Sequence, residues 1–283
     1  MHEQVLARLV TRHGGLRLFV RAVWGRAYPR IIGLQREKSW LAFDIVLPLM
    51  SVAAYVFVYR AIHAPEAYVG FVVLGGTMTA FWLNVLWNMS SQLYWEKEQG
   101  NLALYILAPA PLMAILLGMA VGGAVATTLR ALVFTFLGTL VFQVTFSVAA
   151  WLPLFGVFFL ALAALYGLGM MFASLFLLLS REAWHLVALF QEPVYLLSGF
   201  YFPVKSFPFW VAAAASLIPL TMGLDAMRQL AFPDGTQYGF LPVGWEIAGL
   251  AGLSVLFIVA ARYLLAYMER LAKQEARLTE SRG

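Results

Sequence analysis

The side chains that could do chemistry are few, and their spacing excludes the commonest reactions. The histidines and lysines are His2, His13, His63, His185, Lys38, Lys97, Lys205 and Lys273. No two histidines have the spacing of metal ligands, and neither H-E-x-x-H nor G-x-S-x-G occurs. No lysine follows a glycine, so the phosphate-binding loop G-x-x-x-x-G-K-[ST] is absent, and there is no cysteine to act as a nucleophile. We therefore expect this chain to have no catalytic residue, no metal site and no cofactor of its own.

Two charged residues interrupt apolar stretches, where they could bind a substrate or each other. Arg130 lies within residues 112–143, and Glu192 lies within residues 184–202. A charge at the centre of a bilayer costs about 2.5 to 3.5 kcal/mol on insertion scales. We predict an intramembrane pair between Arg130 and Glu192, because pairing offsets this cost without a ligand; substrate contact is the alternative. Glu246 begins the last apolar stretch and is expected to face water.

The elements that must position these residues are membrane helices. Of the 283 residues, 62% are hydrophobic and 12% are charged, whereas soluble domains carry roughly a quarter of charged residues. The apolar runs long enough to span a bilayer, which takes about 20 residues, are 41–59, 68–90, 112–143, 151–179, 184–202 and 244–266. The sequence thus predicts an all-α membrane protein with six transmembrane helices. The run 112–143 is too long for one upright span, so it must tilt, bend or project.

The distribution of positive charge predicts the orientation of these spans. An even number of spans places both ends on one side. With the N-terminus inside, inner segments carry fifteen Lys and Arg and outer segments carry three, while Arg130 lies within a span. Cytoplasmic loops carry such an excess, so we expect a multi-pass protein of the cell membrane with both termini cytoplasmic. The net charge of +5 then reflects orientation, and no nucleic-acid partner is expected.

The chain divides into a cytoplasmic N-terminus (1–40), a transmembrane domain (41–267) and a cytoplasmic tail (268–283). Within the first region, residues 14–38 alternate arginines with apolar residues at helical spacing. This pattern predicts an amphipathic helix that lies in the membrane interface, although a solvated tail is the alternative. Gly118, Gly122 and Ala126 recur every fourth residue, which favours close helix packing, within one subunit or at a dimer seam.

The connection between the second and third spans, residues 94–109, combines a charged cluster, a glycine and a short apolar stretch that ends in Pro109. It opens with Tyr94, Trp95, Glu96, Lys97, Glu98, Gln99, Gly100 and Asn101. By parity this segment is cytoplasmic.

The connection after the fifth span is rich in proline, and its apolar stretches are too short to cross a bilayer. It opens with Ser198, Gly199, Phe200, Tyr201, Phe202 and Pro203. Irregular backbone at membrane depth requires cover by protein, so residues 203–230 are predicted to form a re-entrant helical pair in the outer leaflet.

These two connections resemble those of type-2 ABC exporter permeases. The first follows the family's order of acidic, basic and acidic residues, glycine, a small polar residue and leucine, but departs from it at Ala103, where a carboxylate is frequent. The second reads Leu-Ser-Gly, then aromatic residues and proline, then Pro-Leu-Thr and Asp-Ala-Met-Arg. The resemblance implies a dimer, with a second copy or a close paralogue, driven by cytoplasmic P-loop ATPase subunits that bind ATP and Mg.

The resemblance also implies roles for particular segments. Residues 14–38 and 94–109 would rest on the ATPases, and residues 198–203 would line the substrate exit. The apolar spans favour an amphiphilic substrate such as a lipid, a lipid-linked glycan or a hydrophobic drug. A membrane channel or scaffold that needs no ATPase is the alternative function.

Overall fold

The computed structural model describes residues 15–275 except 37, 149, 180, 181 and 234, and every regular element in this part of the chain is helical. The helices are α2 (Leu16–Arg36), α3 (Lys38–Ala61), α4 (Ala67–Leu83), α5 (Gln92–Glu98), α6 (Asn101–Leu107), α7 (Leu112–Phe142), α8 (Trp151–Leu179), α9 (Glu182–Leu197), α10 (Phe209–Ala215), α11 (Pro219–Ala231) and α12 (Val243–Glu275). The π-helical turn η1 (Asn84–Met89) joins α4 to α5, and the 3-10 turns are η2 (Val204–Ser206) and η3 (Gly235–Tyr238).

Four of the described helical segments are long and apolar enough to cross a membrane: Ala67–Glu98, Leu112–Phe142, Trp151–Leu179 and Val243–Leu271. The pair α10 and α11 is bent by 108° and could be a fifth span or a re-entrant pair. The predicted all-helical class is confirmed. The predicted first span corresponds to α3, whose apolar part is the shorter stretch Ile45–Ala61. The predicted fifth span corresponds to α9, which has 16 residues. Both are shorter than the four long segments.

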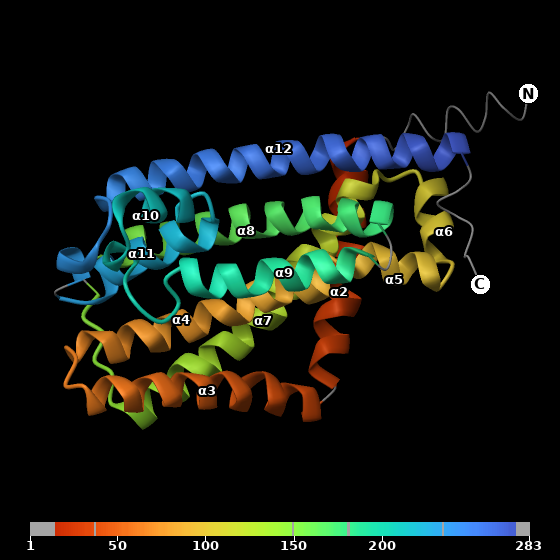
Figure 1. Cartoon of the computed structure of the whole chain (residues 1–283). Helices are drawn as coiled ribbons and strands as arrows, with labels where there is room; N and C mark the ends of the chain where they lie inside the picture. Colours follow the sequence, from red (N-terminus) through yellow and green to blue (C-terminus); the bar gives the residue numbers. More distant parts are fainter. Residues whose placement is uncertain (1–14, 37, 149, 180–181, 234, 276–283) are drawn as a thin grey trace, which may run out of the picture.

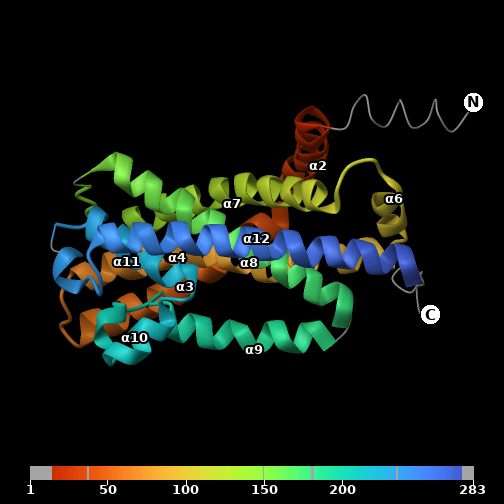
Figure 2. The same cartoon turned by 90° about the horizontal axis from the view of Figure 1, so that it is seen from above.

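The long helices run side by side along one axis (Figure 1), and α7 and α9 lie on opposite sides of the layer that contains α8 and α12 (Figure 2). The main core fills the space between α4, η1, α7, α8, α11 and α12 with large apolar side chains. Its most deeply buried members include Phe81, Trp82, Leu116, Phe176 and Phe200. Since burial and packing of these side chains fix the bundle, the core sets the positions of the polar residues at its two ends.

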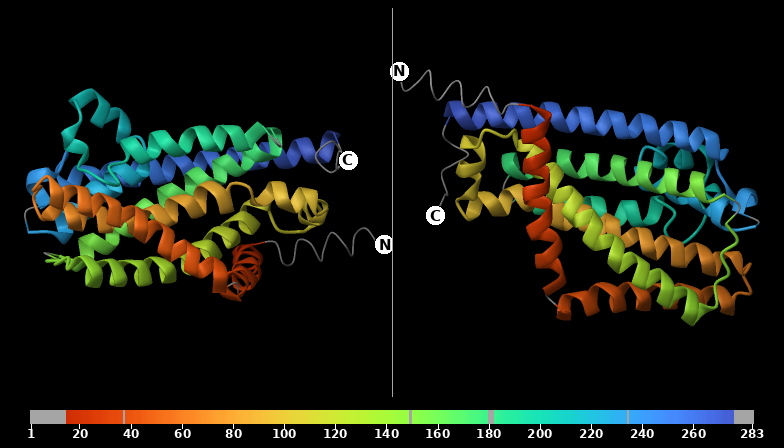
Figure 3. Two further views of the ribbon diagram at one scale, coloured as in Figure 1. Left: turned by 60° about the horizontal axis from the view of Figure 1, so that its bottom comes forward. Right: turned by 180° about the vertical axis from the view of Figure 1, so that it is seen from behind.

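Helix α2 crosses the bundle instead of joining it lengthwise (Figure 3). It packs on α7 where that helix carries small residues: an added Cβ would lie 2.4 Å from Val23 O at Gly118 and 2.8 Å from Ala27 O at Gly122. The small-residue spacing on α7 therefore serves packing within one subunit. The close approach places the arginines of α2 beside α5.

At the other end of the bundle, α4 approaches the turn that follows α9. An alanine Cβ at Gly75 would lie 1.8 Å from Phe200 O, which is a backbone atom and cannot rotate away. We expect Gly75→Ala to destabilise the protein by about 2 to 3 kcal/mol, because overpacking shifts the backbone. Thermal unfolding of the purified protein measures this effect. The matched control is Gly156→Ala on α8, where a Cβ meets nothing within 4 Å; equal unfolding temperatures for the two variants would contradict the assignment.

Candidate functional site

The segment between α4 and α7 forms a junction at the end of the bundle opposite α10 and α11 (Figure 1). Helix α5 continues the line of α4, and the chain then turns sharply into α6. The turn is made by Gly100, whose φ of +76° lies in the left-handed region that favours glycine. The turn brings the first residues of α6 back over α5.

Glu96 lies at the centre of this junction, with only 3% of its surface exposed. Its carboxylate accepts hydrogen bonds from Asn101 Nδ2 and Tyr105 OH on α6, each at 3.0 Å, and from Gln92 Nε2 on α5 at 3.1 Å. It also forms an ion pair with Arg26 of α2. Because a buried charge requires such partners, one carboxylate joins three helices.

A second contact reinforces the attachment of α2. Arg30, one helical turn after Arg26, donates a hydrogen bond to Gln92 Oε1. The pKa of Arg30 is lowered from its usual value, mainly because the guanidinium is buried and also because the positive charge of Arg26 lies close to it. The guanidinium of Arg26 also lies 5.2 Å from the ring centroid of Tyr105, a distance typical of cation–π contact. Side-chain contacts therefore join α2 to both α5 and α6.

The eight residues singled out at the start of residues 94–109 divide into two groups. Tyr94 and Glu96 are buried, and Tyr94 packs against the rings of Trp95, Phe176 and Trp184. The remainder present an accessible face: Trp95 is 47% exposed, Glu98, Gln99 and Gly100 are exposed, and Lys97 and Asn101 are partly exposed. The buried pair therefore holds the segment in place, and the accessible residues are the ones able to meet a partner.

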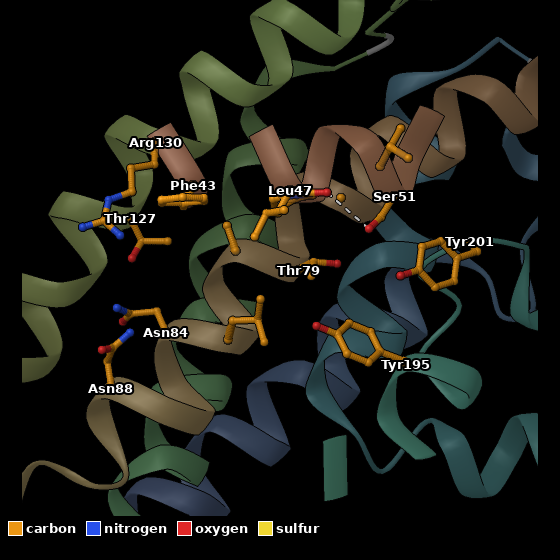
Figure 4. A pocket seen from close by; sticks show the side chains of 15 residues that line it. Phe43, Leu47, Ser51, Thr79, Asn84, Asn88, Thr127, Arg130, Tyr195 and Tyr201 are labelled. Atoms are coloured by element: carbon orange, nitrogen blue, oxygen red, sulfur yellow. Dashed lines mark hydrogen bonds between the residues drawn. The ribbon is translucent and has the colours of Figure 1, made fainter. Parts of the chain in front are cut away.

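A cavity of about 280 Å³ lies between α3, α4, α7 and α9. Its polar end is formed by Asn84, Asn88, Thr127 and Arg130, and its far end by Tyr195 and Tyr201, with Phe43 and Leu47 between them (Figure 4). The cavity is therefore amphipathic along its length.

The predicted partners Arg130 and Glu192 lie on different helices. Arg130 lines this cavity from α7, whereas Glu192 is exposed on α9 and accepts a hydrogen bond from Gln191 Nε2 at 3.3 Å. Their pairing stays a prediction.

The turn after α9, residues 198–203, is fastened by an arginine whose role the sequence did not reveal. Arg228 of α11 is fully buried and donates hydrogen bonds to the backbone oxygens of Phe71 and Phe200, both at 3.0 Å, and of Phe202 at 3.3 Å. Ser198, Gly199, Phe200 and Pro203 are buried, and Phe202 is partly buried. Arg228 therefore holds the backbone of the residues before and after Tyr201, and Tyr201 itself lines the cavity.

The expectation that Glu246 faces water was wrong. It is 1% exposed and accepts a hydrogen bond from Gln229 Nε2 at 3.1 Å, because α11 packs over the start of α12. Gln229 also approaches Asp225, whose carboxylate accepts the Phe240 N–H at 2.7 Å. Among the described residues, no group of three or more His, Asp and Glu side chains is arranged to hold a metal ion.

Comparison with known proteins shows which family this chain resembles. Residues 29–232, from α2 to the end of α11, match the model of the family described as ABC-2 type transporter. A segment of 141 residues is 28% identical to the probable multidrug ABC transporter permease YbhR of Escherichia coli strain K12, and the figures are the same for its counterpart in strain O157:H7. The matched segment covers 50% of this chain and 38% of each relative.

Proposed function

This chain belongs to the ABC-2 type transporter family as a membrane permease subunit, and we propose that it exports an amphiphilic substrate under the drive of a separate P-loop ATPase. The observation that carries the proposal is the junction at Glu96. A motor outside the membrane can act on the spans only through a rigid element that reaches it. Helices α5 and α6 extend from a span, and Glu96 ties them to α2. ATP and Mg bind to the partner ATPase, and this chain transmits the motion.

The proposed topology has six spans and both termini in the cytoplasm. Helices α3 and α9 supply two of the spans, since both lie alongside the long helices, and α10 and α11 form the re-entrant pair in the outer leaflet (Figure 1). On α3, Met50 and Phe57 are exposed in the single chain, and so are Phe43 and Leu47, where the cavity opens to the surface. An apolar surface of this kind fits lipid or a neighbouring membrane subunit.

Helix α2 is proposed to lie in the inner membrane interface. Leu16, Val20, Trp24 and Tyr28 form an exposed apolar stripe at intervals of four residues, and α2 crosses the direction of the spans (Figure 3). An amphipathic helix with basic residues and aromatic anchors binds in the plane of the interface. This placement puts Arg26 and Arg30 at the cytoplasmic side of the spans.

We further propose that the permease works as a dimer, with a second copy or a close paralogue. The substrate classes are a lipid, a lipid-linked glycan or a hydrophobic drug. The proposal of a hydrophobic drug as substrate is supported by the similarity to a protein named as a probable multidrug permease. All three substrate classes fit an amphipathic cavity.

Co-purification and reconstitution test the proposed function. The full chain is purified with its associated ATPase, placed in proteoliposomes and supplied with ATP, and movement of a fluorescent phospholipid or of the dye Hoechst 33342 is followed. We expect transport that requires ATP hydrolysis. Transport at the same rate after removal of the ATPase would instead establish the channel, and full activity of the ATPase without any movement of either probe would favour a scaffold.

The accessible face of α5 gives a prediction about assembly. Trp95 projects partly into solvent while its ring rests on Tyr94 and Trp184, and aromatic residues of this kind dominate binding energies at interfaces. We expect Trp95→Ala to weaken ATPase binding at least tenfold in a pull-down titration. Trp210→Ala, an exposed tryptophan at the opposite end, is the control and should bind normally. Equal binding by both variants would remove Trp95 from the docking surface.

A further inference from the structure

We propose that the side-chain amide of Asn84 donates a hydrogen bond to the transported molecule, so that the cavity selects amphiphiles whose polar group is a hydrogen-bond acceptor, such as a carbonyl or phosphoryl oxygen. The proposal rests on the proposed function, since it names the substrate class of the cavity in this permease. It is carried by the orientation of one buried amide.

Tyr166 fixes that orientation. Its hydroxyl on α8 donates to Asn84 Oδ1 at 3.0 Å, and both side chains are buried. The amide oxygen is therefore engaged, and the described residues leave Nδ2 as the polar atom without a partner in a residue that lines the cavity. Asn84 is only 4% exposed, and Nδ2 has no acceptor among the residues that the structure describes. An amide NH2 group carries two donors, and both are unpaired in the described part of the chain, whereas one of the two acceptor positions of Oδ1 is engaged by Tyr166.

The backbone around Asn84 is shaped to bring the amide to the cavity wall. Asn84 begins the π-helical turn η1, which interrupts an apolar span, and π-helical turns inside longer helices occur frequently at functional sites. Gly123 of α7 faces the amide, and a Cβ there would lie 2.9 Å from Asn84 Oδ1. An asparagine within a membrane span is expensive, and polar residues at that depth mark pathways for substrates.

Two hydroxyl groups of the cavity wall are already engaged within their own helices. Thr79 donates to Gly75 O at 3.0 Å, and Ser51 donates to Leu47 O at 3.3 Å. The Asn84 donor lies at the polar end of the cavity near Arg130, while aromatic and aliphatic side chains form most of the remainder (Figure 4). This division suits an acceptor headgroup at the polar end and an apolar tail along Phe43 and Leu47, short of the Tyr195 and Tyr201 hydroxyls that point into the cavity (Figure 4).

Binding of two matched probes tests the proposal. The full chain is placed in phosphatidylcholine nanodiscs without ATP or ATPase, and radiolabelled dodecyldimethylphosphine oxide, which only accepts hydrogen bonds, is compared with dodecylammonium, which only donates them. We expect Asn84→Leu to weaken binding of the phosphine oxide about tenfold and to leave dodecylammonium binding unchanged. Asn84→Asp should reverse the preference between the two probes, since a carboxylate attracts the donor.

Tyr166→Phe tests whether the tyrosine acts by positioning the amide. Without the hydroxyl the amide can turn, so the ratio of the two affinities should move toward dodecylammonium although Asn84 is intact. The control is Thr79→Val, which removes a hydroxyl that its own helix already engages, and its ratio should equal that of the unmodified protein.

An affinity ratio that stays the same in Asn84→Leu and in Tyr166→Phe would overturn the proposal, even if Asn84→Asp failed to fold. The assay contains no ATPase, so that result would leave the junction at Glu96 and the proposed export function untouched. If the unmodified protein bound the two probes as expected but showed no ATP-driven transport with its ATPase, the result would count against the proposed function alone.

Discussion

Replacing Glu96 with glutamine is expected to reduce the substrate transported per ATP hydrolysed by tenfold or more. The glutamine side chain keeps nearly the same shape, but it lacks the charge that the ion pair with Arg26 requires and one of the two acceptor oxygens. Hydrogen bonds to charged groups contribute about 1.5 to 3 kcal/mol, which corresponds to a factor of about 10 to 150. With this link weakened, α5 and α6 can move without α2. Simultaneous assays of ATP hydrolysis and transport in proteoliposomes measure the ratio.

The control for Glu96→Gln is Glu98→Gln, which makes the same chemical change two residues later on an exposed side chain. Glu98 belongs to the accessible face and takes no part in the contacts of Glu96, so its substitution can weaken attachment of the ATPase, but the ratio of transport to hydrolysis in the assembled complex should be retained. If both variants lost coupling to the same extent, the charge of the segment would matter and its internal contacts would not. If neither lost it, the junction would have no role in transmission.

Arg228→Met is expected to have the largest effect on stability, lowering the unfolding temperature by roughly 10 °C. Methionine fills part of the space, but the backbone oxygens of Phe200 and Phe202 lose their donor, and that of Phe71 within α4 loses its second donor. Each buried group left without a partner costs about 1 to 3 kcal/mol, and 1 kcal/mol shifts the melting temperature of a domain of about 150 to 250 residues by about 2 to 4 °C. Thermal unfolding of the purified variant gives the value.

Lys205→Met is the matched control for Arg228→Met. Lys205 is an exposed base nearby that makes one hydrogen bond, to Gln237 O at 2.7 Å. The control should melt within about a degree or two of the unmodified protein, because surface substitutions have small effects. An Arg228→Met variant that melts at the same temperature as this control would show that the turn after α9 is held by apolar packing instead.

The sequence predicted the apolar helices well because their boundaries are local. The run 151–179 coincides with α8. The run 112–143 corresponds to α7, which begins after Pro111 and ends where Gln143 adopts a left-handed conformation. Proline before a helix and a left-handed residue after it are both local signals. Helix α2 was expected over residues 14–38 on the same grounds, and it spans Leu16–Arg36.

The candidate site was less accessible from the sequence, because its contacts join residues far apart in the chain. Arg228 ends the Asp-Ala-Met-Arg motif of the connection after the fifth span, yet it binds the backbone of Phe71, 157 positions away. Glu246 was expected in water because nothing in its own segment covers it. No sequence pattern distinguishes Asn84, since the π-helical turn that it begins leaves no pattern in an apolar run.

The charged segment shows where local reasoning stops. The family resemblance implied a partner surface at residues 94–109, and the composition of the segment gave no means of separating Glu96 from Glu98. One is buried among donors from α2, α5 and α6, and the other is exposed. The distinction depends on where α2 crosses the bundle, which is set by the close packing of Gly118 and Gly122 against its backbone.

The most direct test of the account is a double-mutant cycle between Arg26 and Glu96, read as substrate transported per ATP hydrolysed. The variants are Arg26→Gln, Glu96→Gln and the double substitution. If the ion pair transmits motion between α5 and α2, the double variant should be no worse than Glu96→Gln alone, because residues in contact give non-additive effects. A double variant whose defect equals the product of the two single defects would contradict the account, since the two residues would then act independently.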